Sequence, residues 1–139
     1  MWQALGAVKL ASQYQERGLL AKVKTTEEAP GTMTETLDVV KQRLDRVVAK
    51  YAEKLPDEAT EIVHETYLNL FEGVEGPLIE QNADLVSDLE KDFNVTLPKA
   101  LKNGSSVDEV RKVVNAMHTK LDKAKALLAK AEKSKKEVF

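Results

Sequence analysis

The sequence predicts an all-α protein, an antiparallel four-helix bundle with short extra helices between the third and the last long helix. Apolar residues recur at intervals of three and four along most of the 139-residue chain, which places them on one face of each helix. Helix-breaking and helix-capping residues separate these apolar series. No segment alternates apolar and polar residues over the length of a strand. Residues 1–139 are therefore expected to form a single helical domain.

The N-terminal segment, residues 1–30, is interpreted as a helix followed by a loop. Its apolar series begins at Leu5 and ends near Leu20, and Gly18 weakens the last turn. Pro30 then breaks the chain. A second helix is expected to begin beyond this break.

The second helix is predicted to be capped by Thr34 or Thr36, whose hydroxyls can accept bonds from free amides of the first turn. Its apolar stripe consists of Leu37, Val40, Leu44, Val47 and Tyr51. Pro56 is expected to end this helix and open the third, with Asp57 and Glu58 at the positive end of the helix dipole.

The third helix has a broader apolar face, as expected for a more deeply buried helix. This face consists of Ala59, Ile62, Val63, Tyr67, Leu70, Phe71 and Val74. Tyr67 and Phe71 are interpreted as core residues. The pair Gly76-Pro77 is predicted to end the helix, and short helices are expected at residues 82–93 and 98–102, separated by Leu97-Pro98.

The last helix is the longest one predicted. Gly104, after Asn103, is expected to adopt the left-handed conformation that ends a helix, and Ser106 with Glu109 forms a capping box. The following stripe consists of Val107, Val110, Val114, Met117, Leu121, Ala124, Leu128 and Ala131. Two long stripes of this kind can close a monomeric bundle or join two chains, so a homodimer is left open.

The net charge of −2 conceals a strong separation of charge along the chain. Residues 53–92 contain twelve acidic side chains and two lysines, whereas residues 111–136 contain nine basic side chains and two acidic ones. The acidic half is expected to attract cations, and the basic half an acidic surface. The sequence has no cysteine, so a metal would need carboxylate, imidazole, carbonyl or water ligands.

Several classes of function lack a motif. The chain has no glycine-rich phosphate loop, nucleophile elbow or Ser/His/Asp grouping, and its lysine-rich last helix has no interleaved aromatic residues. We therefore expect a non-enzymatic protein with no organic cofactor and no nucleic-acid partner. No run approaches the length of about 18 apolar residues that a membrane span requires.

Carboxylates at helical spacing form the candidate site. Glu65, Glu72 and Glu75 fall near one line of the third helix, and His64 is next to Glu65. Carboxylates with one imidazole suit a hard or borderline cation such as iron, manganese, calcium or zinc. If these carboxylates converge within about 2.0–2.6 Å of one point, a metal site is favoured. If they point into solvent, a helical interaction module without a metal site is favoured instead.

Glu72 and Glu75 stand out because they are expected at the C-terminal end of a helix. The helix dipole disfavours an anion there by a few tenths of a kcal/mol up to about 1 kcal/mol. The presence of two glutamates in this unfavourable position suggests a requirement other than helix stability. The neighbouring Gly73 and Gly76 are interpreted as a helix stop or as a point of close helix approach.

Three blocks of sequence together resemble a known family. They are the run from Tyr67 to Gly76, then Leu85, Leu89-Glu90 and Phe93, and then the run from Gly104 to Val110. Over residues 35–130 the chain resembles the extracytoplasmic helical domain that precedes the membrane helices in many bacterial high-affinity iron permeases of the ferric transporter family. The resemblance matches Glu72 and Glu75 to an acidic turn and Glu90 to a leucine-glutamate segment.

This resemblance implies a periplasmic or extracytoplasmic module, attached to or excised from a membrane protein, that captures or senses iron. Its partners would be the metal ion and the permease or another iron-uptake protein. The permeases' Arg-Glu-x-x-Glu motif is only echoed, because Phe71 stands where the arginine would be. A cytoplasmic location is left open.

Two alternatives to metal capture remain open. One is a helical interaction module whose acidic face binds a basic partner without metal. The other is a bundle with an internal apolar cavity for a ligand, which the nearly complete apolar stripes and the few aromatic residues disfavour.

Overall fold

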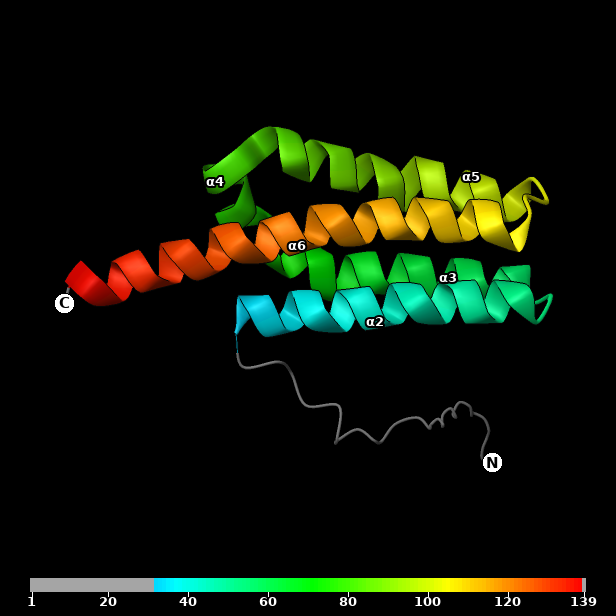
Figure 1. The fold of residues 1–139 in the computed structure, drawn as a ribbon, viewed down its shortest axis with the longest axis horizontal. Helices are drawn as coiled ribbons and strands as arrows, with labels where there is room; N and C mark the ends of the chain where they lie inside the picture. The colour runs from blue at the N-terminus through cyan, green and yellow to red at the C-terminus, as the bar shows by residue number, and fades with distance from the viewer. Residues whose placement is uncertain (1–31, 139) are drawn as a thin grey trace, which may run out of the picture. The chain divides into compact units, whose positions relative to one another are not determined.

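The computed structural model describes residues 32–138, and every regular segment within them is helical (Figure 1). The predicted all-α class is therefore confirmed for this part of the chain. The predicted helix and loop of residues 1–30 lie outside the described residues. The elements in chain order are α2 (Met33–Ala52), α3 (Pro56–Thr66), η1 (Tyr67–Phe71), α4 (Glu72–Lys91), η2 (Asp92–Thr96), α5 (Leu97–Lys102) and α6 (Val107–Val138). The two η segments are short π-helical stretches within longer helices.

The first turn of α2 is capped by a threonine that the sequence analysis did not select. The hydroxyl of Thr32 accepts a bond of 3.1 Å from the amide of Glu35, and the Glu35 carboxylate accepts one of 3.1 Å from the amide of Thr32. The predicted caps Thr34 and Thr36 are wrong because α2 begins earlier, at Met33. Glu35 lies three residues after Thr32, which completes a capping box.

The turn between α2 and α3 is made by Lys54, whose φ of 67° is unusual for a residue other than glycine. Pro56 opens α3 as predicted, with Asp57 and Glu58 in its first turn. It does not end α2, which stops earlier, at Ala52.

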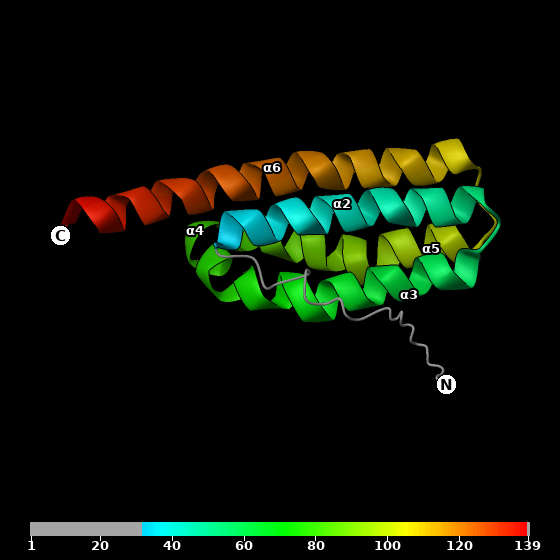
Figure 2. The same cartoon turned by 90° about the horizontal axis from the view of Figure 1, so that it is seen from below.

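The chain reverses direction inside α4, at Asn82 (Figures 1 and 2). Asn82 has φ −163° and ψ 90°, and its side-chain oxygen accepts a 3.0 Å bond from the amide of Leu85, which caps the second part of α4. The predicted helix start near Asn82 is confirmed. The predicted stop at Gly76-Pro77 is wrong, because burial of Val74 and Leu78 on one helical face favours a continuous helix.

The second part of α4 continues without interruption through η2 into α5. Two separate short helices were predicted here, with a break at Leu97-Pro98. Instead the helix continues through Pro98, which lies in the first turn of α5 directly after the π-helical segment η2. This stretch lies against α6.

The core is a single cluster of buried side chains from α2, α3, η1, α4, η2, α5 and α6. The predicted stripes of α2 and α6 supply its longest rows, with Leu37, Val40, Leu44 and Val47 fully buried in α2. Tyr51 is partly buried and donates a 2.5 Å bond to the carbonyl of Ser105. Burial of these rows is the main source of stability for helices of this kind.

The helices α2 and α6 are joined by a row of polar contacts. Lys125 pairs with Asp38, Lys41 with Asp122 at 2.5 Å, and His118 with Asp45 at 3.1 Å. Residue numbers rise along α2 as they fall along α6. The bond from Lys41 holds the pKa of the Asp122 carboxyl below its ordinary value.

Among the helices of residues 32–138, none combines the length and apolar character needed to cross a membrane.

Candidate functional site

The most distinctive polar cluster connects the two parts of α4 on either side of Asn82. The Tyr67 hydroxyl donates to Oε2 of Glu75 at 3.1 Å, and the Glu75 carboxyl is hydrogen-bonded to that of Glu90. The side-chain amide of Asn94 donates to the backbone carbonyl of Glu90 at 2.9 Å. We refer to the two carboxyls as the Glu75–Glu90 pair. Its contacts come from both π-helical segments and from both parts of α4.

Three aromatic rings fix the position of this cluster at the edge of the core. The ring centroids of Phe71 and Phe93 are 5.3 Å apart, and that of Tyr67 lies 6.0 Å from Phe71 and 5.6 Å from Phe93. Phe71 and Phe93 are fully buried, so the prediction of Phe71 as a core residue is confirmed. Tyr67 is partly buried and packs against the core, with its hydroxyl directed to Glu75.

Electrostatics favour a proton on the Glu75–Glu90 pair. Burial, the hydrogen bond to Glu90 and the charges of Glu90 and Glu72 raise the pKa of Glu75 to about 7, against a smaller opposing effect of the bond from Tyr67. Burial and the neighbouring Glu75 also raise the pKa of Tyr67 to about 12, so its phenol stays neutral and remains a donor. The cluster can therefore hold or release one proton near neutral pH.

The five residues predicted to bind a cation do not all come together. Glu75 and Glu90 are paired, and Glu72 is exposed and acts on Glu75 through its charge. Glu65 lies in another electrostatic environment, where burial and Glu61 raise its pKa and two arginines of α2, Arg43 and Arg46, oppose the shift.

His64 belongs to a different surface depression. It lines a groove of about 420 Å³ between α3 and α5 together with Pro56, Asp57, Thr60, Pro98, Leu101 and Lys102. Within residues 32–138, no group of three or more His, Asp or Glu side chains is arranged to hold a metal ion. The prediction relied on α-helical spacing from residue 65 to 75, but η1 inserts a π-helical turn that shifts this register.

The special position inferred for Glu72 and Glu75 is also changed by the structure. Both residues lie inside a continuous helical stretch, in the first turn of α4, rather than at a helix C-terminus. A Cβ atom built on Gly73 or Gly76 would meet nothing within 4 Å. Neither a helix stop nor a close helix approach therefore explains these two glycines.

An ion pair at the edge of the core was not among the features predicted from the sequence. Nζ of Lys120 in α6 lies 2.8 Å from Oδ2 of Asp92 in η2, and Asp92 is 8% exposed. Asp92 continues the buried row of Leu85 and Leu89 at helical spacing, so an acidic residue on an apolar stripe was the available signal. Thr66, just before η1, is fully buried, and its hydroxyl has no partner among the described residues.

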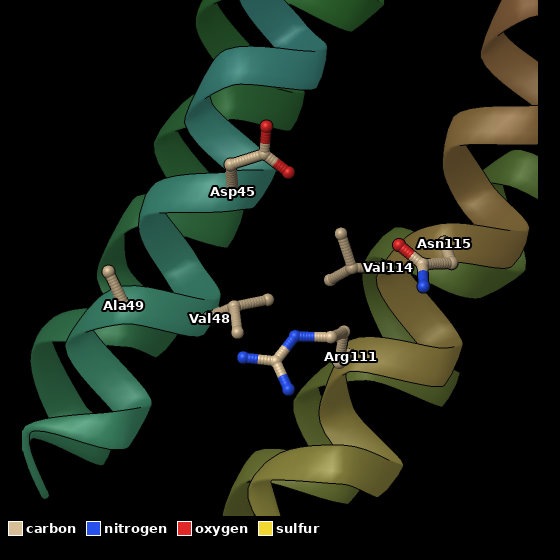
Figure 3. Close-up of a pocket in the computed structure, with 6 residues that line it drawn as sticks. All are labelled: Asp45, Val48, Ala49, Arg111, Val114 and Asn115. Carbon is tan, nitrogen blue, oxygen red and sulfur yellow. The ribbon is translucent and has the colours of Figure 1, made fainter.

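A second groove of about 280 Å³ lies between α2 and α6 (Figure 3). It is lined by Asp45, Val48, Ala49, Arg111, Val114 and Asn115. Arg111 extends from α6 toward Val48 of α2 in this view. Its charged groups already have partners, since Asp45 pairs with His118 and Arg111 with Asp108 at 3.2 Å. This groove is therefore a weaker candidate than the Glu75–Glu90 pair and the acidic surface around it.

Comparison with known proteins found no relative that would help to interpret these features. No family model matches the chain, and neither a curated protein nor a solved structure matches it. The resemblance to the extracytoplasmic domain of iron permeases therefore stays a prediction from the residues alone.

Proposed function

We propose that the chain is a non-enzymatic helical interaction module that binds a basic partner through the acidic surface of α3 and α4. We also propose that its helices form an antiparallel four-helix bundle. This bundle differs from the predicted one, because it counts no helix from residues 1–30. Here α2 is the first helix and α6 the last, and the chain reversal at Asn82 divides the intervening helical stretch into two. The polar row of α2 and α6 supports opposite directions for these two helices.

The functional proposal is carried by the exposure of the acidic side chains in residues 53–92, which we call the acidic stretch. Of its twelve acidic side chains, nine are exposed, Glu75 and Glu90 are partly buried, and Asp92 is buried. The exposed ones are Glu53, Asp57, Glu58, Glu61, Glu65, Glu72, Glu80, Asp84 and Asp88. Glu58 pairs with Lys50 and Asp92 with Lys120, and the charges of Arg43 and Arg46 in α2 act on Glu65. Most of its negative charge therefore faces solvent.

A surface with one sign of charge attracts partners of the opposite sign. Repulsion between neighbouring carboxylates destabilises the folded chain slightly, and a basic partner would relieve it while its approach is accelerated by the field. Because the charges are exposed, salt should weaken the interaction strongly. We refer to the eight exposed acidic side chains of α3 and α4, which exclude Glu53, as the acidic face.

A direct test uses a fluorescent lysine-rich peptide as the probe, with fluorescence anisotropy measured at low and physiological salt. Replacing Glu61, Glu65 and Glu80 by glutamine should weaken binding of the peptide at least tenfold. The matched control replaces Lys112, Lys123 and Lys130 of α6 by glutamine, which removes the same number of charges and should not weaken binding. Equal affinity of the acidic-face variant and the original chain would rule out this proposal.

Metal capture, the extracytoplasmic function that the permease resemblance implies, is the second candidate. It is favoured by the Glu75–Glu90 pair, with Glu72 nearby, since carboxylate oxygens are ligands for iron. The test is calorimetric titration with ferrous iron (anaerobic), ferric citrate, manganese, zinc and calcium. Micromolar binding that disappears in a Glu72→Gln/Glu75→Gln variant with unchanged circular dichroism would favour metal capture. Absence of binding would leave the interaction module.

A further inference from the structure

We propose that the basic partner of the acidic face is a second copy of this chain, which presents a row of lysines on the outer side of α6. The row consists of Lys112, Lys123 and Lys130, and we refer to it as the basic line. This inference rests on the proposed function, because it names the partner of the same acidic face. Each chain would offer its acidic face to one neighbour and its basic line to another.

Helical spacing places the three lysines of the basic line in one row. Lys123 follows Lys112 after about three turns of helix and precedes Lys130 by about two, so the row is about 27 Å long. All three side chains are exposed. Ala116 and Ala126 lie between them on the same side of α6, and both are exposed and small. A second chain can therefore approach the lysines closely.

The basic line has no ion pair of its own within residues 32–138, in contrast to two other lysines of α6. Lys120 pairs with Asp92 and Lys125 with Asp38, so these two lysines hold α6 against the rest of the chain. The lysines of the basic line take part in no such contact among the described residues. Their charges remain available to a partner.

The basic line lies away from much of the acidic face. Figure 2 shows α6 along one edge of the group of helices and α3 along the opposite edge, and α3 carries four of the eight acidic-face residues. The end of α6 also extends beyond the other helices (Figures 1 and 2). The last buried side chain described in α6 is that of Leu128, and the exposed Lys130 follows it. The lysines and the carboxylates of α3 can therefore meet only between two chains.

The carboxylates of α3 match the lysines in spacing. Glu58 and Glu65 are about two turns apart, as are Lys123 and Lys130, so both pairs span about 10 Å. Two helices lying side by side can therefore bring both charges of one pair opposite those of the other. Glu58 also contacts Lys50 at 3.4 Å, but a surface contact of this kind contributes little and can be exchanged for one with a second chain.

The net charge of the chain favours contact between copies. A net charge of −2 gives only weak repulsion between two chains, whereas the separated acidic and basic residues attract each other. The acidic face and the basic line are different surfaces, so the contact is head-to-tail. A dimer of this kind keeps one acidic face and one basic line free. Association should therefore continue beyond the dimer as concentration rises.

The basic line fits a protein surface better than a membrane or a nucleic acid. A helix that lies on a membrane inserts an apolar face, but that of α6 is buried in the core, with Val114, Met117 and Leu121 at its centre. The acidic face would repel anionic lipid and phosphate groups alike. The described part of α6 also has no Phe, Tyr or Trp on which a base could stack.

The first experiment is sedimentation equilibrium of the full chain at about 10 mM and about 1 M sodium chloride. At low salt the average mass should rise with concentration above the 15.5 kDa of one chain, and at high salt it should stay there. The reason is that the Debye length falls from about 30 Å to about 3 Å. A chain that stays monomeric at low salt would overturn the inference. Binding of the lysine-rich peptide would then still test the proposed function separately.

The second experiment mixes two variants that each lack one surface. They are the acidic-face variant of the peptide test and a lysine variant in which the basic line is replaced by glutamine. Each alone should self-associate about tenfold more weakly than the original chain. An equimolar mixture should form a complex of two chains with the original affinity and no larger species, because one intact acidic face then meets one intact basic line. A mixture that associates no better than the separate variants would rule out the contact.

The matched control replaces Lys91, Lys99 and Lys102 by glutamine. These lysines are exposed and lie outside α6, and their loss changes the net charge as much as the lysine variant does. The control should self-associate like the original chain, and an equal loss in both variants would contradict a contact at the basic line. Sedimentation with phosphatidylserine vesicles tests the lipid alternative. Binding of a monomeric chain to the vesicles that disappears in the lysine variant would assign the basic line to lipid and overturn the inference.

Discussion

Nζ of Lys120 lies 2.8 Å from Oδ2 of Asp92, and this ion pair joins the long helix α6 to the π-helical segment η2. The Asp92 side chain is 12% exposed and that of Lys120 is 32% exposed. The exposure of this ion pair is therefore intermediate. A surface salt bridge contributes little to stability, whereas the loss of one partner of a buried salt bridge is costly.

Replacing Lys120 by alanine should reduce the free energy of unfolding by about 1–3 kcal/mol, because the mostly buried Asp92 carboxylate would lose its partner. Urea denaturation at pH 7 measures the change. Lys123→Ala removes an exposed lysine of the same helix and should change stability by no more than about 0.5 kcal/mol. Equal effects of the two substitutions would show that the ion pair does not contribute.

Replacing Phe93 by alanine should reduce the free energy of unfolding by about 3–5 kcal/mol, since the ring is fully buried against Phe71 and Tyr67. The control is Val95→Ala in the same π-helical segment, where the side chain is 52% exposed. This control should cost about 0.5 kcal/mol or less. A small loss for Phe93→Ala would contradict the position of the ring in the core.

Two glycine substitutions should change stability in opposite directions. Gly104 has φ of 72°, so Gly104→Ala should cost about 1 kcal/mol through backbone strain alone, because the added Cβ meets nothing within 4 Å. Gly73 lies in the helix interior with equal space, so Gly73→Ala should stabilise by up to about 1 kcal/mol. Thermal denaturation of both variants checks the signs, and a stabilising Gly104→Ala would contradict the left-handed turn.

The pKa of Glu75 is raised from 4.5 to about 7 in the folded chain, so stability should fall as pH rises toward this value. Replacing Tyr67 by phenylalanine should move this loss of stability to higher pH. The Tyr67 hydroxyl lowers the pKa of Glu75 through its hydrogen bond, so its removal leaves the proton more tightly held. The midpoint of the stability change against pH measures this shift. Tyr51→Phe removes a hydroxyl bonded to Ser105 instead, and it should lower stability without moving the midpoint. A midpoint unaffected by Tyr67→Phe would mean that the hydroxyl does not act on Glu75.

Much of the helical structure follows from short-range patterns that the sequence displays directly. Val110, Val114, Met117 and Leu121 were predicted to share one face of the last helix, and all are buried. The predicted capping box also forms, with the Ser106 hydroxyl accepting from the Glu109 amide at 3.1 Å and the Glu109 carboxylate accepting from the Ser106 amide at 2.9 Å. These features depend on residues three or four positions apart, so little else is needed to predict them.

The candidate site was predicted less completely because its parts meet through the tertiary structure. Glu75 and Glu90 were both selected, but not as a pair, and Tyr67 was assigned only to the core. The pair Gly76-Pro77, which lies between Glu75 and Glu90 in the sequence, suggested that the third helix ends directly after Glu75. Burial of Val74 and Leu78 outweighs that local signal and moves the reversal to Asn82, which decides the partner of Glu75.

By itself, the sequence determined the all-α class, the stripes of α2 and α6, the left-handed Gly104 and the separation of acidic from basic residues. Tertiary structure alone decided the pairing of Glu75 with Glu90 and of Asp92 with Lys120. Helical periodicity and capping arise from contacts within about one turn, so they can be recognised along the chain. Contacts between distant carboxyls and lysines depend instead on where the chain turns back and on how π-helical segments rotate each side chain, and packing of the whole core sets both.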